Sequence, residues 1–284
     1  MLEIADIPAM REWRAGRRAA GERVAFVPTM GALHDGHLSL VEEARRRAGA
    51  VVVSVFVNPL QFGPSEDFAS YPRDLARDRD LARQRGVHAL FVPSVETMFP
   101  AAAEIRVVPG ASASRWEGAL RPGHFTGVLT VVAKLFHIVE PDVAVFGQKD
   151  IQQVTLVTGM VRDLDWAVEV VASPTVRAAD GLALSSRNAY LSSAQRHQAL
   201  ALPRALRKAD QAWRHGEQMA AALEAVVQRE LAAADGLTVD YIAVVEPATL
   251  QPVAQAEVGT IIAVAVRAGE TRLLDNHILG REFP

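Results

Sequence analysis

Residues 24–49, VAFVPTMGALHDGHLSLVEEARRRAG, join a short apolar run directly to an amphipathic segment. The run Val24–Pro28 has the length and the Val content of a buried strand. The segment Gly36–Ala48 places its apolar side chains at helical spacing, with Asp35 as the expected N-cap. A strand that leads through a short loop into a helix is the repeating unit of parallel α/β sheets, so this stretch predicts that fold class.

The same alternation of Val-rich runs and helical segments continues to residue 173. Further strands are expected at Ala50–Val57, Ala89–Pro93, Val143–Phe146 and Val168–Ser173. Further helices are expected at Leu75–Arg85, Thr126–Val139 and Ile151–Arg162. This order predicts a doubly wound, Rossmann-like parallel sheet.

The pattern changes after Ser173-Pro174, and the next regular elements are two Ala-rich helical segments. These segments cover 193–215 and 217–233, and strand-like alternation follows at 239–245, 260–267 and 271–276. Helices followed by a group of strands favour a separate α+β domain. We therefore expect a Rossmann-like domain over residues 1–175 and a smaller C-terminal α+β domain over residues 176–284.

The composition excludes several classes of partner. Half of the 284 residues are hydrophobic, and 30 basic against 33 acidic residues give a formal charge of −3, so nucleic acid is not expected as a partner. The chain has no Cys, which excludes disulfides and thiolate metal sites and fits a reducing compartment. Since the N-terminus lacks a signal-peptide pattern and no apolar run approaches the roughly 20 residues of a membrane span, we expect a cytoplasmic protein without a membrane partner.

The loop after the first strand carries HDGH at residues 34–37. Loops that follow parallel strands lie at the ligand-binding edge of such a sheet. His34 and His37 would share a face at the start of a helix, where imidazole N–H groups and backbone amides bind phosphate, and Gly31 and Gly36 allow the backbone to approach a nucleotide. Phosphate binding is the favoured interpretation. A solvent-facing His pair and half of a metal site are the alternatives, although no HExxH partner is present.

Polar side chains also follow two other expected strands. Asn58 and Gln61, in FVNPLQF, carry amides suited to hydroxyl and carboxylate oxygens, although Asn-Pro also begins ordinary turns. Lys149, in GQKD, is one of only three lysines in the chain, and a compact ammonium suits a moving phosphate group. A solvated loop lysine is the alternative there.

Two further segments contain candidate site residues. Ser185, Ser186 and Arg187 follow the turn at Asp180-Gly181 and would form a phosphate clamp on a mobile domain, although the pattern alone also fits a helix cap or a surface loop. Arg121 and His124, in LRPGHFTG, are candidates for which a structural turn is nearly as good an explanation, and Tyr71 is in the same class.

Four of these segments together resemble a known family. PTMGALHDGHLSL at 28–40 resembles the HxGH signature of the nucleotidylyltransferase superfamily, in the form found in pantothenate synthetases. FVNPLQF, FGQKDIQQ and DGLALSSRNAYL are similar to the FVNPxQF, FGxKDxQQ and DGLAxSSRNxYL segments of that family. The resemblance is dense over residues 24–191, and DNHIL at 275–279 is its last familiar feature.

The resemblance implies a set of site residues. ATP binding is implied for Met30, Gly31, His34, Gly36, His37, Gly147, Lys149, Asp150, Val176, Leu184, Ser185, Ser186 and Arg187. A catalytic part is implied for His34, His37, Lys149, Ser185, Ser186 and Arg187. The residues expected to bind the other substrates are Gln61 and Gln153, which the resemblance places on pantoate, with Asn58, Tyr71, Arg121 and His124 as further candidates. No metal ligand is expected.

The activity implied by the resemblance is the condensation of pantoate with β-alanine through a pantoyl adenylate, with release of AMP and diphosphate. ATP would be a substrate, and Mg²⁺ would bridge its phosphates. The first domain would bind nucleotide and pantoate, the second would act as a lid, and the protein would be a homodimer. The alternatives are a nucleotidylyltransferase acting on a small phosphorylated substrate and a nucleotide-sensing module without turnover.

Overall fold

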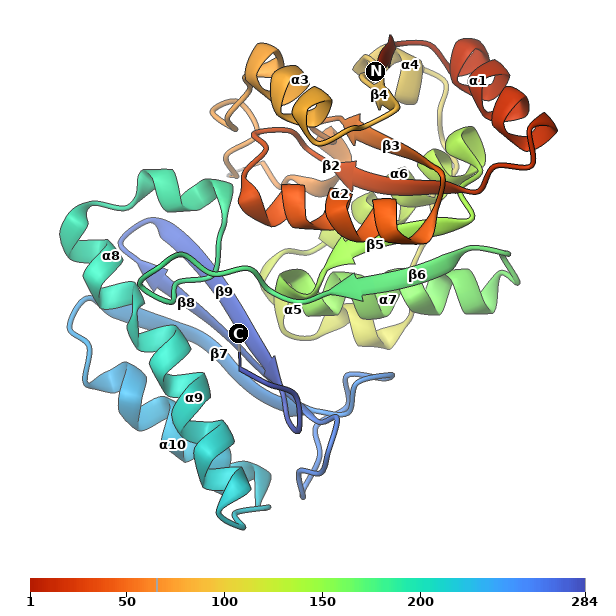
Figure 1. The fold of residues 1–284 in the computed structure, drawn as a ribbon. Coiled ribbons are helices and arrows are strands. Elements are labelled where there is room, and N and C mark those ends of the chain that lie inside the picture. Colours follow the sequence, from red (N-terminus) through yellow and green to blue (C-terminus); the bar gives the residue numbers. More distant parts are fainter. Residues whose placement is uncertain (65, 284) are drawn as a thin grey trace. The chain divides into compact units, whose positions relative to one another are not determined.

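The computed structural model describes residues 1–64 and 66–283, which form two compact units (Figure 1). Unit 1 comprises residues 1–147 and 156–173, and unit 2 comprises residues 148–155 and those from 174 onward. The chain passes to unit 2 after Ser173, close to residue 175, where the sequence pattern changes. The segment 148–155 was expected in the first domain, but it groups with unit 2.

Unit 1 contains a six-stranded parallel sheet, as the sequence predicts. Its strands are β1 (Leu2–Ile4), β2 (Val24–Thr29), β3 (Ala50–Val55), β4 (Ala89–Phe91), β5 (Val143–Gly147) and β6 (Glu169–Ser173). Their order is β1-β4-β3-β2-β5-β6, with all neighbours parallel. The chain builds outward from β2 through β3 to β4 and then returns to β5 on the other side. The switch point of this doubly wound sheet therefore lies between β2 and β5.

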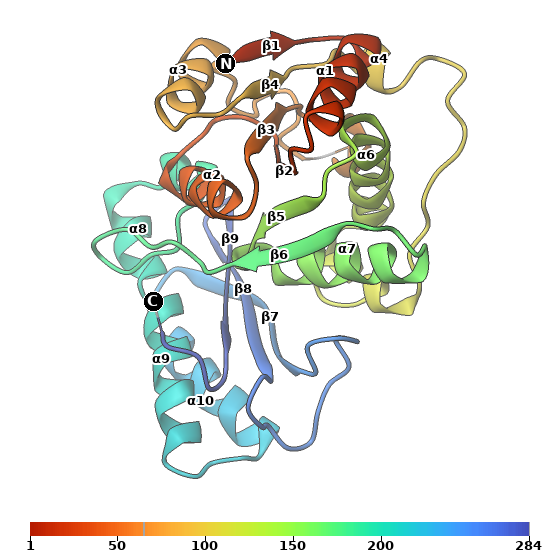
Figure 2. The same cartoon turned by 45° about the vertical axis from the view of Figure 1, so that its right-hand side comes forward.

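Helices cover both faces of this sheet (Figure 2). The helices are α1 (Ile7–Ala19), α2 (Asp35–Arg47), α3 (Leu75–Gln84), α4 (Val95–Met98), α5 (Glu117–Leu120), α6 (His124–Val139) and α7 (Ile151–Asp163). Ala25 and Val27 of β2 face a core shared with α2 and α3. Phe26 points the other way, where its ring lies 6.4 Å from that of Phe136 on α6. Because both faces are buried, the strands read as continuous apolar runs.

The first 23 residues, where no element was predicted, form the edge strand β1 and the helix α1. β1 has only three residues, of which two are exposed. α1 is rich in Arg, but Arg14 is buried, and it donates hydrogen bonds to the Glu140 carbonyl oxygen (2.8 Å) and to Asp142 Oδ2 (3.2 Å). Both elements lie before residue 24, where the alternation of apolar runs and helical segments that predicts the fold begins.

Unit 2 combines three helices with a three-stranded antiparallel sheet, which confirms the predicted α+β class. Its elements are α8 (Ser193–Ala199), α9 (Ala201–Arg214), α10 (Ala220–Ala232), β7 (Leu237–Val245), β8 (Ile261–Ala268) and β9 (Thr271–Ile278). α9 and α10 cover one face of the sheet (Figure 1), and Leu206, Leu223 and Val264 lie in the core between them. The single helix predicted over 193–215 is divided at Leu200 between α8 and α9.

Within the described ranges, no helix combines the length and the apolar character needed to cross a bilayer.

Candidate active site

The turn after β2 is held in an unusual shape by two side chains. Gly31 and Ala32 have positive φ values of 84° and 50°. The Gly31 N–H donates to Thr29 Oγ1 (3.1 Å), and the Thr29 hydroxyl donates in turn to the Ser54 carbonyl oxygen (2.6 Å). On the other side, Asp78 Oδ2 and Oδ1 accept the N–H groups of Ala32 (2.9 Å) and Leu33 (2.7 Å). The three successive N–H groups are therefore bonded within the protein.

Asp78 is a residue of this site that the sequence analysis missed. Its side chain lies on α3 and is only 1% exposed. Burial raises the pKa of the Asp78 carboxyl above its ordinary value, whereas the N–H donors of Leu33 and Ala32 oppose that rise. A Cβ on Gly31 would lie 2.9 Å from Asp78 Oδ2, so the turn needs glycine here. In the sequence Asp78 is hidden within the charged run RDLARDRD, which looks like a solvated helix.

The HDGH motif begins helix α2, but the N-cap differs from the predicted one. His34 is the N-cap and Asp35 is the first helical residue, so the assignment of Asp35 as N-cap is wrong. His34 Nδ1 accepts the Gly36 N–H (3.1 Å), and His37 Nδ1 accepts the His34 N–H (3.4 Å), which gives a reciprocal capping box. An imidazole nitrogen thus does what a carboxylate was expected to do.

This capping determines which nitrogen of each imidazole carries the proton. Because both Nδ1 atoms accept hydrogen bonds, the neutral rings of His34 and His37 carry their protons on Nε2. The two ring centroids are 4.1 Å apart. The start of α2 therefore holds two adjacent imidazoles as N–H donors at the positive end of a helix, an arrangement suited to an anion.

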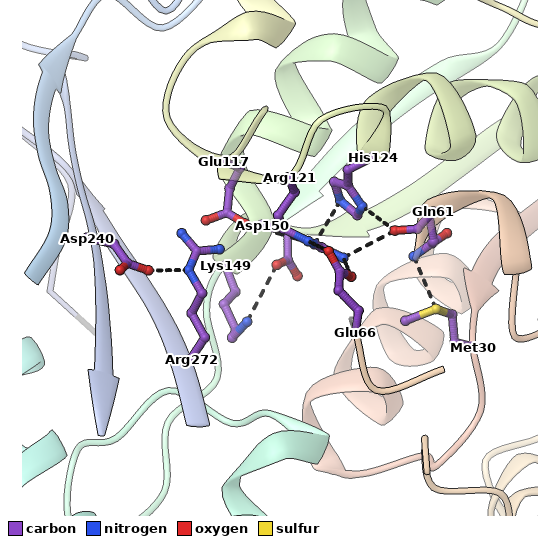
Figure 3. Close-up of polar contacts among 10 residues, drawn as sticks. All are labelled: Met30, Gln61, Glu66, Glu117, Arg121, His124, Lys149, Asp150, Asp240 and Arg272. Atoms are coloured by element: carbon purple, nitrogen blue, oxygen red, sulfur yellow. Dashed lines mark hydrogen bonds and ion pairs between the residues drawn. The ribbon is translucent and has the colours of Figure 1, made fainter. Parts of the chain in front are cut away.

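The amide side chains of Asn58 and Gln61, after β3, form a buried network, of which Figure 3 shows the contact between Gln61 and Met30. Asn58 is 1% exposed, and its Nδ2 donates to Gln61 Oε1 (3.0 Å) and to the Gly127 carbonyl oxygen (3.1 Å). Gln61 Nε2 lies 3.1 Å from Met30 Sδ. Asn58 also caps the short turn η1 (Pro59–Gln61) by accepting the Leu60 N–H (3.2 Å). The observed contacts of Asn58 are thus those of a residue that begins a turn, and they hold Gln61 in place.

Arg121 and His124 converge on the backbone of Gln61 (Figure 3). His124 Nδ1 lies 2.8 Å from the Gln61 carbonyl oxygen and Arg121 Nη2 lies 3.2 Å from it. A carbonyl can only accept, so Nδ1 of His124 carries the proton and Nε2 accepts from Arg121 Nη1 at 3.1 Å. Glu66, which the sequence analysis did not single out, pairs with Arg121 through both carboxylate oxygens (2.9 and 2.5 Å). Tyr71 is buried, and its ring packs edge-on against Phe62 at 5.9 Å.

The GQKD segment connects β5 to α7. Gly147 is the last residue of β5 and pairs with Ser173 of β6. Lys149 and Asp150 lie in the short turn η3 (Gln148–Asp150), with Lys149 Nζ 3.5 Å from Asp150 Oδ1 (Figure 3). Gln153 follows on the first turn of α7 and is partly buried. Lys149, Asp150 and Gln153 all belong to unit 2.

The segment that contains LSSR begins with a small hairpin. The Leu184 N–H donates to the Val176 carbonyl oxygen (2.9 Å), and Arg177 and Ala183 form an isolated bridge. Ser185 is the N-cap of the short turn η4 (Ser186–Tyr190), and its Oγ accepts the Arg187 N–H (3.3 Å). The capping alternative is thus realised at Ser185, while the hairpin brings Val176 and Leu184 side by side.

The predicted residues are divided between the two units. In unit 1, contacts join Gln61 to Met30, Asn58, Arg121 and His124. His34, Gly36 and His37 lie together at the start of α2. Lys149, Asp150, Gln153, Val176 and residues 184–187 are in unit 2. Among residues 1–64 and 66–283, no three His, Asp or Glu side chains are grouped so as to hold a metal ion.

Comparisons with known proteins identify the family. Residues 3–278 match the sequence profile described as pantoate-β-alanine ligase. Pantothenate synthetase from Agrobacterium fabrum is 50% identical over 99% of this chain and 97% of its own length, and that from Moorella thermoacetica is 49% identical over 97% and 98%.

Solved structures give the same result. A pantothenate synthetase structure from Thermus thermophilus has a TM-score of 0.93 at 49% identity, covering 98% of this chain and 99% of its own. A Francisella tularensis pantoate-β-alanine ligase, complexed with "beta-gamma ATP" and β-alanine, has a TM-score of 0.80 at 31% identity, covering both chains in full. Because the family profile matches residues 3–278 and these relatives are about half identical over nearly the whole chain, the chain belongs to the pantoate–β-alanine ligase family.

Proposed function

We propose that this chain is an ATP-dependent ligase that condenses pantoate with β-alanine to form pantothenate, AMP and diphosphate. The match of residues 3–278 to the ligase family carries this proposal, because it spans all four motif segments. The Francisella relative, whose structure contains an ATP ligand and β-alanine, supports these two substrates. The nucleotidylyltransferase alternative is not favoured, since the family profile and the relatives described above are ligases.

The chemistry requires activation of a carboxylate. A carboxylate is a poor electrophile and lacks a leaving group, so amide formation with an amine in water is slow. A pantoate carboxylate oxygen attacks the α-phosphorus of ATP, and the bond to diphosphate breaks. The amine of β-alanine then attacks the acyl carbon of the adenylate, and AMP leaves with the bridging oxygen. Positioning and charge stabilisation dominate the first step, so donors and cations are needed more than a covalent nucleophile.

The capped start of α2 suits the phosphate side of this reaction. His34 and His37 would each direct an Nε2–H towards phosphate oxygens, since their Nδ1 atoms bond the backbone. Met30, Gly31 and Gly36 would let the nucleotide approach the backbone. The N–H groups of residues 31–33 already have acceptors in Thr29 and Asp78, so in this conformation they would shape the turn rather than bind phosphate.

The network around Gln61 suits the pantoate side. Gln61 would bind pantoate, and Asn58 would act by orienting its side chain. Arg121 and His124 would act by holding the backbone of Gln61. Tyr71 would form part of the apolar surroundings on the substrate side.

Unit 2, together with Gly147 of unit 1, would supply the remaining groups. Lys149, Ser185, Ser186 and Arg187 would stabilise the charge on the transferring phosphate. Gly147, at the end of β5, and Asp150 would contact the nucleotide, Val176 and Leu184 would contact the adenosine, and Gln153 would bind pantoate. We propose residues 1–175 as the nucleotide- and pantoate-binding domain and residues 176–284 as the lid, although Lys149, Asp150 and Gln153 group with the latter.

Three further properties are part of the proposal. Mg²⁺ would accompany ATP, held by phosphate oxygens and water, as this ion usually is. The protein would be a homodimer in the cytoplasm.

Product analysis tests the proposal. ATP, Mg²⁺, pantoate and β-alanine are incubated with the enzyme, each being omitted in turn, and the products are identified by mass spectrometry. We expect AMP, diphosphate and pantothenate in equal amounts only from the complete mixture. Formation of ADP and phosphate, or transfer of AMP to a stable second product, would contradict the proposed reaction.

A further inference from the structure

A single buried amide on strand β9 binds the turn that carries Lys149. Asn276 is 2% exposed, and its Nδ2 donates to the carbonyl oxygens of Gln148 and Lys149, both at 2.9 Å. Its Oδ1 accepts from Gln148 Nε2 at 3.2 Å. Both amide protons and the amide oxygen of Asn276 are thus used on one turn, which lies 127 residues or more earlier in the chain. All these residues belong to unit 2.

These contacts fix the base of the Lys149 side chain. The Lys149 carbonyl is one bond from the Cα that bears the side chain, so a shift of this carbonyl moves the ammonium. Neither Asp nor Ala can replace Asn276 here. An ionised Asp side chain only accepts hydrogen bonds, and the Ala side chain neither donates nor accepts them. Loss of the amide would leave the buried Gln148 carbonyl and the partly buried Lys149 carbonyl without these donors.

Strand β9 is a firm support for the turn. Arg272 of β9 pairs with Asp240 of β7 (Figure 3), and β9 pairs with β8 along its whole length. The neighbour of Asn276, Asp275, pairs with Arg177 at 2.6 and 3.0 Å, and both side chains are almost fully buried. Arg177 belongs to the hairpin that leads into residues 184–187. Two consecutive residues of β9 therefore hold the two segments of unit 2 to which phosphate contacts are assigned.

We propose that Asn276 is a positioning residue for adenylate formation, which places the Lys149 ammonium by holding the backbone of the Gln148–Lys149 turn on β9. This inference rests on the proposed function, in which Lys149 stabilises the transferring phosphate. The contacts of Asn276 with residues 148 and 149 are among those that join segment 148–155 to unit 2, although α7 continues into unit 1.

A double-mutant cycle tests whether Asn276 acts through Lys149. The rate of diphosphate release is measured in a single turnover with ATP and pantoate for the wild type, Asn276→Ala, Lys149→Ala and the double variant. We expect each single change to slow release at least tenfold, and Asn276→Ala to add less than a twofold loss once Lys149 is absent. Losses that multiply in the double variant, or an unchanged rate in Asn276→Ala, would overturn the proposal.

Two more variants separate positioning from stability. Asn276→Asp keeps the shape but removes both donors, so we expect it to slow diphosphate release at least tenfold as well. His277→Gln changes the next residue of β9, a buried ring that bonds Asp210 (3.1 Å) on α9. We expect this control to lower Tm while leaving the rate per folded molecule within twofold of the wild type. A rate loss in His277→Gln equal to that in Asn276→Asp would show that general loosening of β9 is responsible.

A spectroscopic readout is independent of turnover. The chain has only three lysines, so ¹³C-lysine labelling gives three side-chain NMR signals, and Lys149→Arg identifies the one from Lys149. In Asn276→Asp we expect this signal to move, while those of Lys134 and Lys208 stay in place. An unmoved Lys149 signal would contradict the proposal even if the enzyme proved to catalyse another reaction. Absence of diphosphate release in the wild type would instead refute the proposed function.

Discussion

Asp78 and two imidazole rings shape the turn after β2, and each of them bonds a different part of its backbone. Asp78 bonds the N–H groups of Ala32 and Leu33, and the rings of His34 and His37 bond the backbone through Nδ1. Ionised Asp78 is costly in its buried position, as its raised pKa indicates. Both oxygens of Asp78 nevertheless accept backbone N–H groups, which suits the carboxylate form and holds the shape of the turn.

We predict that Asp78→Asn weakens ATP binding at least tenfold while the fold is retained. An amide offers only one acceptor, so one N–H group of the turn would face an NH₂ group instead of an oxygen. Removal of the buried charge offsets part of the lost bonding, so Tm should stay within about 4 °C, or roughly 1 kcal/mol, of the wild type. Calorimetric titration with ATP and Mg²⁺ measures the affinity. Asp80→Asn, which changes an exposed partner of Arg83, is the control.

Equal ATP affinities in Asp78→Asn and the wild type would show that this carboxylate is not needed for the binding geometry. A large fall in Tm with normal affinity would reduce Asp78 to a structural role.

Local sequence patterns identify only some of the residues of the site. HDGH, Gln61 and Lys149 were singled out from the sequence because each follows an apolar run that reads as a strand. Asp78 and Asn276 were not, because each acts through hydrogen bonds to residues at least 45 positions away in the chain. Such pairings leave no periodic signal in one sequence, and only the fold brings them together.

At the scale of elements, the central strands and their helices could be predicted because both sheet faces are buried. β2 and β3 are almost fully buried, so apolar runs mark them clearly. β1 escaped prediction because a three-residue edge strand with two exposed residues is too short to form an apolar run. α1 lies before the alternation of apolar runs and helical segments, which begins at residue 24. The start of α2 was misjudged by one residue, since His34 rather than Asp35 caps it.

The contact between α6 and η1 gives a prediction for a glycine. A Cβ on Gly127 would lie 2.1 Å from the Leu60 carbonyl oxygen and 2.7 Å from the Gln61 nitrogen. We expect Gly127→Ala to displace η1, lowering stability by about 1–3 kcal/mol and raising the KM for pantoate more than that for ATP. Thermal unfolding and steady-state kinetics measure both effects.

Gly159→Ala, in α7, is the matched control because no backbone atom lies within 4 Å of the added Cβ. There we expect a gain of about 0.5–1 kcal/mol from higher helix propensity, with both KM values unchanged. If both alanine variants behaved alike, the close approach of α6 to η1 would not be what positions Gln61.

At the scale of the whole molecule, the fold class and the C-terminal change of architecture were predicted from the order of patterns along the chain. The grouping of residues 148–155 with unit 2 was not predicted, because it depends on contacts such as those of Asn276 with Gln148 and Lys149.

Each unit also contains a histidine with a lowered pKa: His88 in unit 1 and His277 in unit 2.

Desolvation lowers the pKa of both histidines below the ordinary value of 6.5. For the buried His277, Asp210 opposes this shift, whereas Arg214 and Arg177 add to it. A lowered pKa means that the unfolded chain takes up a proton before the folded protein does as pH falls. We therefore predict that the contribution of these histidines to the free energy of unfolding is fully present above pH 6.5 and is lost as pH falls below it, with a slope of up to about 1.4 kcal/mol per pH unit from His277.

Denaturant unfolding between pH 8 and pH 5.5 measures this decline, and His277→Gln should make it shallower. An identical slope in the variant would exclude His277 as a source of the pH dependence.

In the proposed reaction, pantoate is activated when its carboxylate attacks the α-phosphorus of ATP. Pantoate labelled with ¹⁸O in its carboxylate tests this directly when it is incubated with enzyme, ATP, Mg²⁺ and β-alanine. The proposed reaction places one ¹⁸O atom in the phosphate of AMP, because the bridging oxygen leaves with AMP when the amide forms. AMP without the label, or ¹⁸O in inorganic phosphate alongside ADP, would contradict it.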